Sequence, residues 1–252
     1  MKLTVIGFWG GYPAVDGATS SYLLEKDGYS LLIDVGSGSL SKLQKYKHVS
    51  DLDAVIVSHY HHDHVADIGV LQYAKLIEYY VTKNDAVLPI YGHTEDNKGF
   101  KTLSHTYTKG IAYSPNEELQ IGPFTITFLR TKHPVPCFGM RITDGESVVV
   151  YTADSSYQEE WGTFAKDADL LITDCNYYAG LDGSKAGHMN SEEAGRIAGI
   201  ASVKQLLLSH LPQYGDREQL ITEARQYYTG EIQLAKEGLT WRRNNSERFP
   251  LN

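Results

Sequence analysis

The chain has 252 residues, of which 42% are hydrophobic and 11% aromatic, enough for the packed core of one large domain. Its formal net charge of -8 disfavours long nucleic acids as partners, because their binding depends on Lys and Arg contacts to phosphates. The two cysteines, Cys137 and Cys175, have no nearby cysteine partner, so neither a disulfide framework nor a thiolate metal site is expected. There is no signal-peptide pattern and no bilayer-length apolar run, so we expect a cytoplasmic protein without membrane contact.

The first half of the chain is expected to open as a sheet. Short strands separated by Gly-rich or Asp-rich turns are predicted at 3–8, 22–25, 30–33 and 54–57. From Asp63 to Val81 the apolar residues recur near helical spacing, so a loop is expected to become a helix there. The segment 83–116 is less regular, and apart from a strand predicted at 88–91 we interpret it as an insertion or a lid.

The second half alternates strands and helices. Asn190, followed three residues later by Glu193, resembles a capping box at a helix start. Strands are predicted at 124–129, 138–142, 148–151 and 170–173, helices at 156–166 and 191–201, and a final strand, helix and strand at 203–208, about 217–228 and 232–235. The absence of a fixed-period repeat or a Pro, Gly or Ser-rich linker favours a single domain over residues 1–252.

Five segments end in an apolar run that is closely followed by a side chain able to bind metal. Strands that end at one rim of a sheet present such residues in loops above that rim, where they converge. The five are Asp34 after 31–33, His59 after 55–58, His133 after 128–132, Asp154 after 148–151 and His210 after 206–209. We therefore expect one site built from all five.

The second segment continues as His59-Tyr60-His61-His62-Asp63-His64, an H-x-H-x-D-H signature. Two histidines at i and i+2 can reach one metal while the following Asp-His pair points toward a second. Imidazole and carboxylate suit zinc or another first-row metal, and two adjacent metals can activate a water and clamp a substrate oxygen. His62 occupies a variable position and is expected to be solvated. The run predicts a two-metal hydrolase.

With these five motifs in order, the chain resembles the metallo-β-lactamase superfamily over nearly its whole length. The resemblance implies an α/β fold, a four-layer αββα sandwich with the metal site at one edge of the two sheets. It implies that Asp154 bridges two metals and that Asp34 supports the ligand loop by hydrogen bonding. It further implies a first metal held by His59, His61 and His133 and a second held by Asp63, His64 and His210.

Two further stretches resemble ribonuclease Z, namely 133–139 (HPVPCFG) and 187–191 (GHMNS). Asp154 instead of a cysteine departs from the true zinc β-lactamases and resembles the phosphodiesterases, lactonases and thioesterases of the superfamily. By the same resemblance His188 approaches the scissile phosphate, where it would donate a proton to the leaving oxygen or stabilise negative charge. The alternative is that His188 is an exposed loop residue before a capped helix.

The chain departs from ribonuclease Z in one region. Only 20 residues separate His133 from Asp154, and two predicted strands occupy them, which leaves no place for a tRNA-gripping arm. We therefore expect a small phosphodiester or nucleotide as substrate and poor processing of precursor tRNA. The expected cofactors are two Zn²⁺, with Mn²⁺ or Fe²⁺ as alternatives. A metal-bridging hydroxide would attack phosphorus, Asp63 would accept a proton and His188 would assist departure of the leaving group.

Two other functions stay open. The first is hydrolysis of a carboxyl ester, lactone or thioester at the same metals, for which His188 would matter little. The second is a metal-dependent sensor or scaffold without turnover. Trp9 and Tyr12 lie in a Gly-rich loop where they would stack on a substrate or belong to the core. The resemblance suggests a homodimer, but the 18 tyrosines are too dispersed in sequence to locate its interface.

Overall fold

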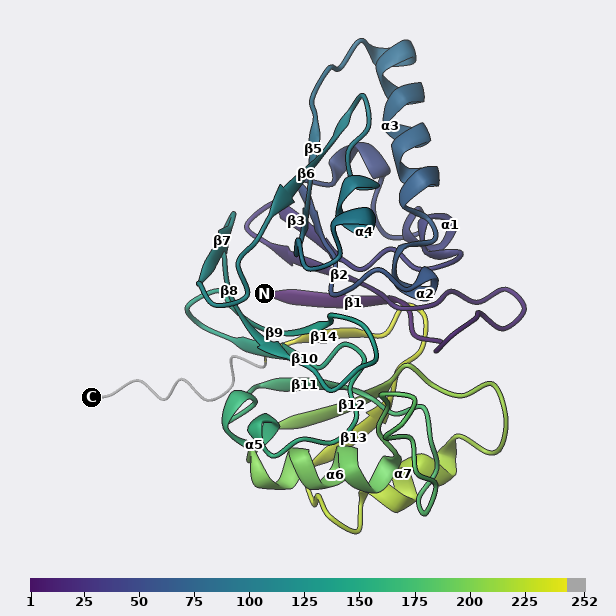
Figure 1. The fold of residues 1–252 in the computed structure, drawn as a ribbon, viewed down its shortest axis with the longest axis vertical. Coiled ribbons are helices and arrows are strands. Elements are labelled where there is room, and N and C mark those ends of the chain that lie inside the picture. Colours follow the sequence, from purple (N-terminus) through teal and green to yellow (C-terminus); the bar gives the residue numbers. More distant parts are fainter. Residues whose placement is uncertain (244–252) are drawn as a thin grey trace.

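Two seven-stranded sheets lie face to face, with helices on both outer faces (Figure 1). The structure is a computed structural model that describes residues 1–243, so residues 244–252 of the predicted domain lie outside the described part. Between those limits the predicted four-layer αββα sandwich is confirmed. None of the helices in residues 1–243 is long and apolar enough to cross a membrane.

The strand order in each sheet separates the first half of the chain from the second, with one exchange at the C-terminal end. The first sheet has the order β14-β1-β2-β3-β4-β5-β6, with β1 Lys2–Gly7, β2 Ser21–Lys26, β3 Tyr29–Ile33, β4 Ala54–Ile56, β5 Leu88–Gly92, β6 Thr108–Ala112 and β14 Thr240–Arg242. The second has the order β13-β12-β11-β10-β9-β8-β7, with β7 Leu119–Ile121, β8 Phe124–Arg130, β9 Phe138–Thr143, β10 Val148–Tyr151, β11 Leu170–Asp174, β12 Gln205–Ser209 and β13 Glu231–Leu234.

Alternation of side chains along the strands produces the layers. In β2, Leu24 belongs to the core between the sheets, whereas its neighbour Leu23 packs toward the helices outside the first sheet. Phe124 and Met140 of the second sheet meet the central core from the other side. All four side chains are fully buried. At roughly 2 kcal/mol for each large apolar side chain removed from water, this core stabilises the contact of the two sheets.

The helices cover the outer faces. On the first sheet, Leu40, Leu43 and Leu71 pack with strand residues in one cluster, and on the second sheet Trp161 and Ile197 do the same. The helices are α1 Ser39–Leu43, the 3₁₀ turn η1 Val49–Asp51, α2 His62–Val65, α3 Ile68–Thr82, α4 Asn97–Lys101, α5 Glu160–Phe164, α6 Ser191–Ile200 and α7 Glu218–Ala224.

Parallel strands at the centre of each sheet bring the predicted site residues to one edge. β3 pairs in parallel with β4, and β11 pairs in parallel with both β10 and β12. The chain turns sharply where these strands end, since Asp34 (φ 56°), Ala153 (φ 51°) and His210 (φ 51°) adopt left-handed backbone that non-glycine residues rarely occupy. Such conformations cost about 1 kcal/mol or more each and persist where surrounding structure holds them, commonly at functional sites.

Several segments differ from the sequence-based prediction, among them the helix expected at about 217–228, which spans only Glu218–Ala224. The helix expected from Asp63 to Val81 is divided into α2 and α3, because the Asp67 amide donates to the carbonyl of Val35 (3.1 Å) instead of continuing the hydrogen bonds of α2. The helix expected at 156–166 is only α5, because Ser156 instead pairs its backbone with Lys132. The segment 83–116 contributes β5 and β6 to the edge of the first sheet, so this part of it is neither an insertion nor a lid.

Candidate metal centre

Asp154 lies at the centre of the residues that the sequence analysis predicted as ligands. It follows β10, is 1% exposed, and is shared by two groups made up of predicted ligands, each with ligand atoms within 4.8 Å of one another. Those groups are His59, His61, His133 with Asp154, and Asp63, His64, His210 with Asp154. The seven predicted ligands therefore converge, with the shared carboxylate between the two halves.

The first group is dominated by imidazoles. Nε2 of His133 lies 3.0 Å from Nδ1 of His61, and Nε2 of His59 lies 3.6 Å from the Asp154 carboxylate. His133 is held by a hydrogen bond of 3.0 Å from its Nδ1 to the carbonyl of Gly187. Gly187 has a φ of 80°, and a Cβ there would lie 2.5 Å from Nδ1 of His133, so only glycine fits.

The second group combines carboxylates and imidazoles. Nε2 of His210 lies 3.1 Å from Asp63 Oδ2 and 3.4 Å from Asp154 Oδ1. Nε2 of His64 lies 3.1 Å from Asp154 Oδ1 and 3.7 Å from Asp63 Oδ2. Asp63 is also tied to the N-terminal loop, since the Gly11 amide donates to its Oδ2 at 2.8 Å. Each carboxylate therefore faces both histidines of this group.

Asp34 supports the site from behind without belonging to either group. Its Oδ2 pairs with Nδ1 of His64 at 2.8 Å and accepts from the Tyr151 hydroxyl at 2.9 Å. Its Oδ1 accepts from the Ser58 amide at 2.8 Å, which fixes the residue before His59. A carboxylate on the far nitrogen of an imidazole sets the ring's tautomer and directs the other nitrogen toward a metal.

Buried polar atoms without hydrogen-bond partners show that the cluster fits cations. Nε2 of His59, Nε2 of His64 and Oδ1 of Asp154 are buried and lack such partners, although they face one another across the centre. Buried nitrogen and carboxylate atoms ordinarily have partners, so convergent atoms without them suit a metal ion. The donor set, imidazole and carboxylate without thiolate, suits a divalent first-row metal.

In the second group the protonation preferences also favour positive charge, whereas burial lowers the pKa of His59, His61 and His133 in the first group. Burial lowers the pKa of His210, but the carboxylates of Asp154, Asp174 and Asp63 outweigh it and raise the value to about 10. Burial alone would raise the pKa of Asp154, yet His210, His64 and His59 hold it well below its usual range. A divalent cation supplies the same positive charge and releases those protons on binding.

His188 lies beside the second group in a pairing that the sequence analysis missed. Its Nδ1 is 2.7 Å from Oδ2 of Asp174, and its ring stacks on that of His210 at 5.0 Å between centroids. Burial lowers the pKa of His188, but the Asp174 carboxylate outweighs this effect and raises it above the ordinary value. With Asp154 and His210, these two residues form a third group with ligand atoms within 4.8 Å.

The signal for Asp174 was present in the sequence. It is the last residue of β11 and follows the apolar run Leu170-Leu171-Ile172, as Asp34 follows β3 and Asp154 follows β10. The predicted strand ended one residue too early, at Thr173, so the carboxylate at its end was not considered.

The Gly-rich N-terminal loop lies against the second group. Its two aromatic residues differ in exposure, since Trp9 is 8% exposed beneath the Arg217 guanidinium, 4.9 Å from its ring, whereas Tyr12 is 63% exposed. Trp9 thus belongs to the core, and Tyr12, next to the Gly11 amide that binds Asp63, is the aromatic residue of this loop with a free ring surface.

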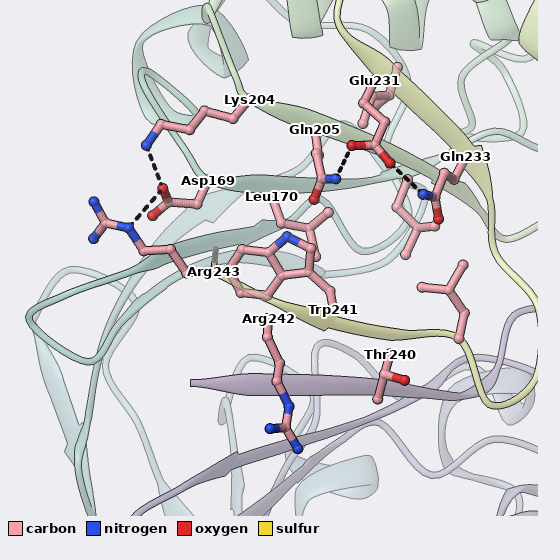
Figure 2. A pocket seen from close by; sticks show the side chains of 13 residues that line it. Asp169, Leu170, Lys204, Gln205, Glu231, Gln233, Thr240, Trp241, Arg242 and Arg243 are labelled. Carbon is pink, nitrogen blue, oxygen red and sulfur yellow. Dashed lines mark hydrogen bonds and ion pairs between the residues drawn. The ribbon is translucent and has the colours of Figure 1, made fainter. Parts of the chain in front are cut away.

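A separate cavity of about 620 Å³ lies at the other end of the second sheet (Figure 2). It is lined by the beginnings of β11, β12 and β13 and by β14, whereas the candidate metal centre lies where β10, β11 and β12 end. Its Asp169 carboxylate is paired with Lys204 at 2.9 Å and lies 3.8 Å from Arg243. Because of this separation and pairing, the cavity is not part of the candidate site.

Comparison with known proteins agrees with this geometry. A family model described as a beta-lactamase superfamily domain matches residues 29–211. The probable metallo-hydrolase YhfI of Bacillus subtilis (strain 168) is 57% identical over 242 residues, which cover 96% of this chain and 99% of that protein. The crystal structure of the metallo-beta-lactamase fold protein YhfI from Bacillus subtilis has a TM-score of 0.94 at 56% identity, covering 95% and 98% of the two chains.

More distant relatives share the fold. A ribonuclease Z of Metallosphaera sedula is 24% identical over 276 residues, covering 90% of this chain and 94% of that one. The crystal structure of a diphosphatase from the PhnP family has a TM-score of 0.77 at 17% identity and covers 96% and 98% of the two chains. The chain belongs to the beta-lactamase superfamily and is a metal-dependent hydrolase with the metallo-β-lactamase fold.

Proposed function

We propose that the chain is a dinuclear zinc phosphodiesterase acting on a small phosphodiester or nucleotide. The observation that carries the proposal is the His188–Asp174 pair at 2.7 Å, stacked against His210 beside the second metal group. An imidazolium fixed at this place suits a reaction in which an oxygen anion leaves, because it can donate a proton to that oxygen. A hydrolase acting only on esters or lactones has less need of it.

The ligand assignment follows the two groups. His59, His61 and His133 would hold the first ion and Asp63, His64 and His210 the second, with the Asp154 carboxylate shared by the two groups. Zinc is the proposed ion because of the imidazole-rich donor set, with Mn²⁺ or Fe²⁺ as alternatives. When bound there, such ions would supply acidification of a water and polarisation of a phosphoryl oxygen. Against the charges of Asp63 and Asp154 they leave about +2 at the centre, which attracts a phosphodiester to an acidic chain.

Side chains of the protein would orient the attacking water and protonate the leaving oxygen. The Asp174 carboxylate is hydrogen-bonded to Nδ1 of His188, which leaves Nε2 as the donor toward the leaving oxygen. Burial raises the pKa of Asp63, but His64 and His210 outweigh it and hold the pKa well below its usual range. This low pKa belongs to the metal-free protein; in the metal-loaded enzyme Asp63, beside Nε2 of His210 at 3.1 Å, is the carboxylate proposed to accept the proton of the attacking water.

Two features support a small substrate. Strands β9 and β10 occupy the residues between His133 and Asp154, where ribonuclease Z enzymes insert a tRNA-gripping arm. The chain's net charge of -8 opposes a long polyanion. The related diphosphatase and ribonuclease Z are both named for reactions at phosphate groups, which favours phosphorus over an acyl carbon as the reacting centre.

The test is hydrolysis of bis(4-nitrophenyl) phosphate by protein loaded with a known amount of zinc. Asp63→Ala and His188→Ala are each expected to lower kcat by about a hundredfold, the usual scale for losing an acid or base. His62→Ala is the matched control, since His62 is an exposed histidine of the same motif and outside both groups. No turnover by the loaded wild type, or equal turnover in all three variants, would count against the proposal.

A parallel panel separates this function from the alternatives. If the chain is instead an ester, lactone or thioester hydrolase, those substrates turn over and His188→Ala leaves their kcat almost unchanged. A zinc-loaded protein inactive on every substrate in the panel would point to a sensor or scaffold. Efficient 3′ cleavage of precursor tRNA would overturn only the proposal that the substrate is small.

A further inference from the structure

The cavity at the far end of the second sheet lies between the outermost strands of the two sheets (Figure 2). β13 is the last strand on one side of the second sheet and β14 the last strand on one side of the first, and both line the cavity with the beginnings of β11 and β12. Its volume of about 620 Å³ is within the range of sites that hold small ligands. A ligand bound here would not contact the candidate metal centre, which lies at the opposite ends of β11 and β12.

One wall of this cavity is apolar. Leu170, Leu207 and Trp241 belong to the core between the sheets and are at most 7% exposed, and Leu239 packs against that core. All four side chains line the cavity. Apolar and aromatic walls with a few polar groups are typical of small-molecule sites, and a flat ring can lie against such a wall.

The indole N–H of Trp241 is a buried donor without an acceptor. The residue is 7% exposed, and no hydrogen bond joins its indole to any other group in residues 1–243. Figure 2 shows the indole nitrogen on the side of the ring that is turned toward Gln205 across the cavity. A tryptophan N–H ordinarily has a partner when it is buried, so this donor indicates an acceptor atom on a ligand.

Two glutamines of the same cavity present acceptors. The Glu231 carboxylate accepts from Nε2 of Gln205 and, at 2.5 Å, from Nε2 of Gln233. An ionised carboxylate can only accept, so it fixes which end of each amide faces it. The Oε1 atoms of both glutamines have no partner in the described part of the chain. Together with the Trp241 N–H, they match the edge of a ring that carries an acceptor beside a donor.

Charge at the β11 end of the cavity favours an anion. Lys204 at 2.9 Å and Arg243 at 3.8 Å share the Asp169 carboxylate, so two cations face one anion. Asp169 also accepts from the Val148 amide at 2.7 Å, and Glu231 accepts from its two amides, so both carboxylates already have donors. Arg243 faces Asp169 through Nε, which leaves its two terminal nitrogens for a bidentate contact to a phosphate.

We propose that this cavity binds a nucleoside monophosphate. The base lies against the apolar wall, where a ring nitrogen accepts from the Trp241 N–H and an amino group donates to Gln205, and the phosphate lies beside Lys204 and Arg243. Nucleobases combine a flat apolar face with acceptors and donors on one edge. A sugar phosphate alone leaves the indole donor unpaired, and a nucleoside alone leaves the positive charge unbalanced. The proposal does not depend on which reaction the metal centre performs.

The test is isothermal titration calorimetry of the zinc-loaded protein with AMP, adenosine and ribose 5-phosphate. AMP is expected to bind at least about tenfold more tightly than either fragment, because each fragment makes only part of the contacts. Trp241→Phe keeps an aromatic ring but removes the N–H, so it should weaken the binding of AMP and adenosine alike, by about tenfold. Arg243→Gln should weaken AMP by about tenfold and leave adenosine unchanged.

Two further variants complete the test. Arg225→Gln is the matched control for charge, since Arg225 is an exposed arginine at the end of α7 that does not line the cavity, and it should bind AMP as wild type does. Gln233→Leu changes an exposed side chain and leaves the core wall intact, so it should weaken AMP even if Trp241→Phe does not fold. Binding of AMP at the metal centre would be equal in all these proteins, because none of the substitutions removes a predicted ligand. No binding of AMP, or equal affinity in wild type, Arg243→Gln and Gln233→Leu, would overturn the proposal.

Discussion

Asp174 connects two histidines that come from different parts of the chain. Oδ2 of Asp174 pairs with Nδ1 of His188 at 2.7 Å, and Oδ1 lies 3.6 Å from Nδ1 of His210. The Ser155 amide donates to the same carboxylate at 3.1 Å, so the residue after Asp154 is tied to it as well. Asp174 thus plays beside the second metal group the part that Asp34 plays behind His64, since it holds the far nitrogen of the His188 imidazole.

Asp174→Asn is expected to lower kcat for a phosphodiester about ten- to a hundredfold, because His188 loses the carboxylate that keeps it protonated and oriented. The alkaline limb of the pH profile should move to lower pH, since the pKa of His188 falls when that carboxylate is removed. Steady-state kinetics across pH, with bound metal measured on the same samples, checks both effects.

The control for this variant is Asp169→Asn, the same substitution just before β11 at the far end of that strand. Asp174→Glu should recover part of the activity if the carboxylate orients His188. An unchanged kcat and pH profile in Asp174→Asn at full metal occupancy would show that the pair has no role in turnover.

His93 is a buried histidine outside both metal groups. Its ring is 0% exposed and lies 4.8 Å from that of Tyr60 and 5.0 Å from that of Phe138. Burial lowers its pKa from the ordinary 6.5 to about 4. Stability that depends on its neutral form is fully present above pH 6.5 and is lost as the pH falls toward 4, because the unfolded chain binds the proton first.

The His93→Leu variant should not show this loss of stability at low pH, because it has no imidazole to protonate. Between pH 7 and 4, wild type should lose about 3 kcal/mol more stability than the variant, as expected for a pKa shift of this size. Denaturant unfolding at several pH values measures the difference. Parallel curves for the two proteins would mean that His93 is not the group responsible.

At the scale of elements, most strands could be predicted from the sequence because even short strands show an alternation of apolar residues. Strand ends after Ile33, Ile56 and Tyr151 were predicted to within a residue or two, and they are followed by Asp34 and by the proposed ligands His59 and Asp154. Short elements that depend on distant partners were missed. β14 forms only by pairing with β1, where Leu3 opposes Trp241, and no local signal indicates that contact.

In the site, too, some residues could be predicted from local sequence patterns, whereas one pair depends on contacts between distant segments. The H-x-H-x-D-H run and the strand-end pattern were sufficient to predict seven converging residues, because parallel strands bring their ends together. The pairing of His188 with Asp174 depends on how the loop before α6 packs over β11. Sequence spacing does not contain that information.

The capping box of α6 was predicted from sequence and is present. The Asn190 side chain accepts from the Glu193 amide at 3.0 Å, and Glu193 accepts from the Asn190 amide at 3.0 Å. Asn190 also donates to the carbonyl of Leu181 at 3.1 Å, which ties the preceding loop to the helix start.

Asn190→Ala is expected to cost about 1 kcal/mol or more of stability, the usual value for a lost helix cap. Thermal unfolding of the metal-loaded variant should show a melting temperature lowered by a few degrees. Asn190→Ser is the control, because serine can also cap and should recover most of the difference. Equal melting temperatures for all three proteins would contradict a capping role.

At the scale of the whole molecule, the candidate metal centre joins the two sheets. Asp34 and His59 follow strands of the first sheet, whereas Asp154 and His210 follow strands of the second. Asp34 bonds across the interface to Tyr151, and Tyr22 bonds to Ser209 at 2.6 Å. An ion bound at this edge would therefore link the two halves of the chain directly, whereas the apolar core joins them only through side-chain packing.

Metal removal should consequently lower the stability of the entire fold. Ions that bind only the folded protein at about a thousand times their dissociation constant add about 4 kcal/mol, so chelator-stripped protein should melt roughly 10 °C below zinc-loaded protein. Differential scanning calorimetry on stripped and reloaded samples measures this gap. It should shrink in Asp154→Ala, which removes the carboxylate common to both groups, and persist in His62→Ala, whose exposed side chain belongs to neither. If stripped and reloaded wild type melt at the same temperature, ions do not join the sheets at this edge.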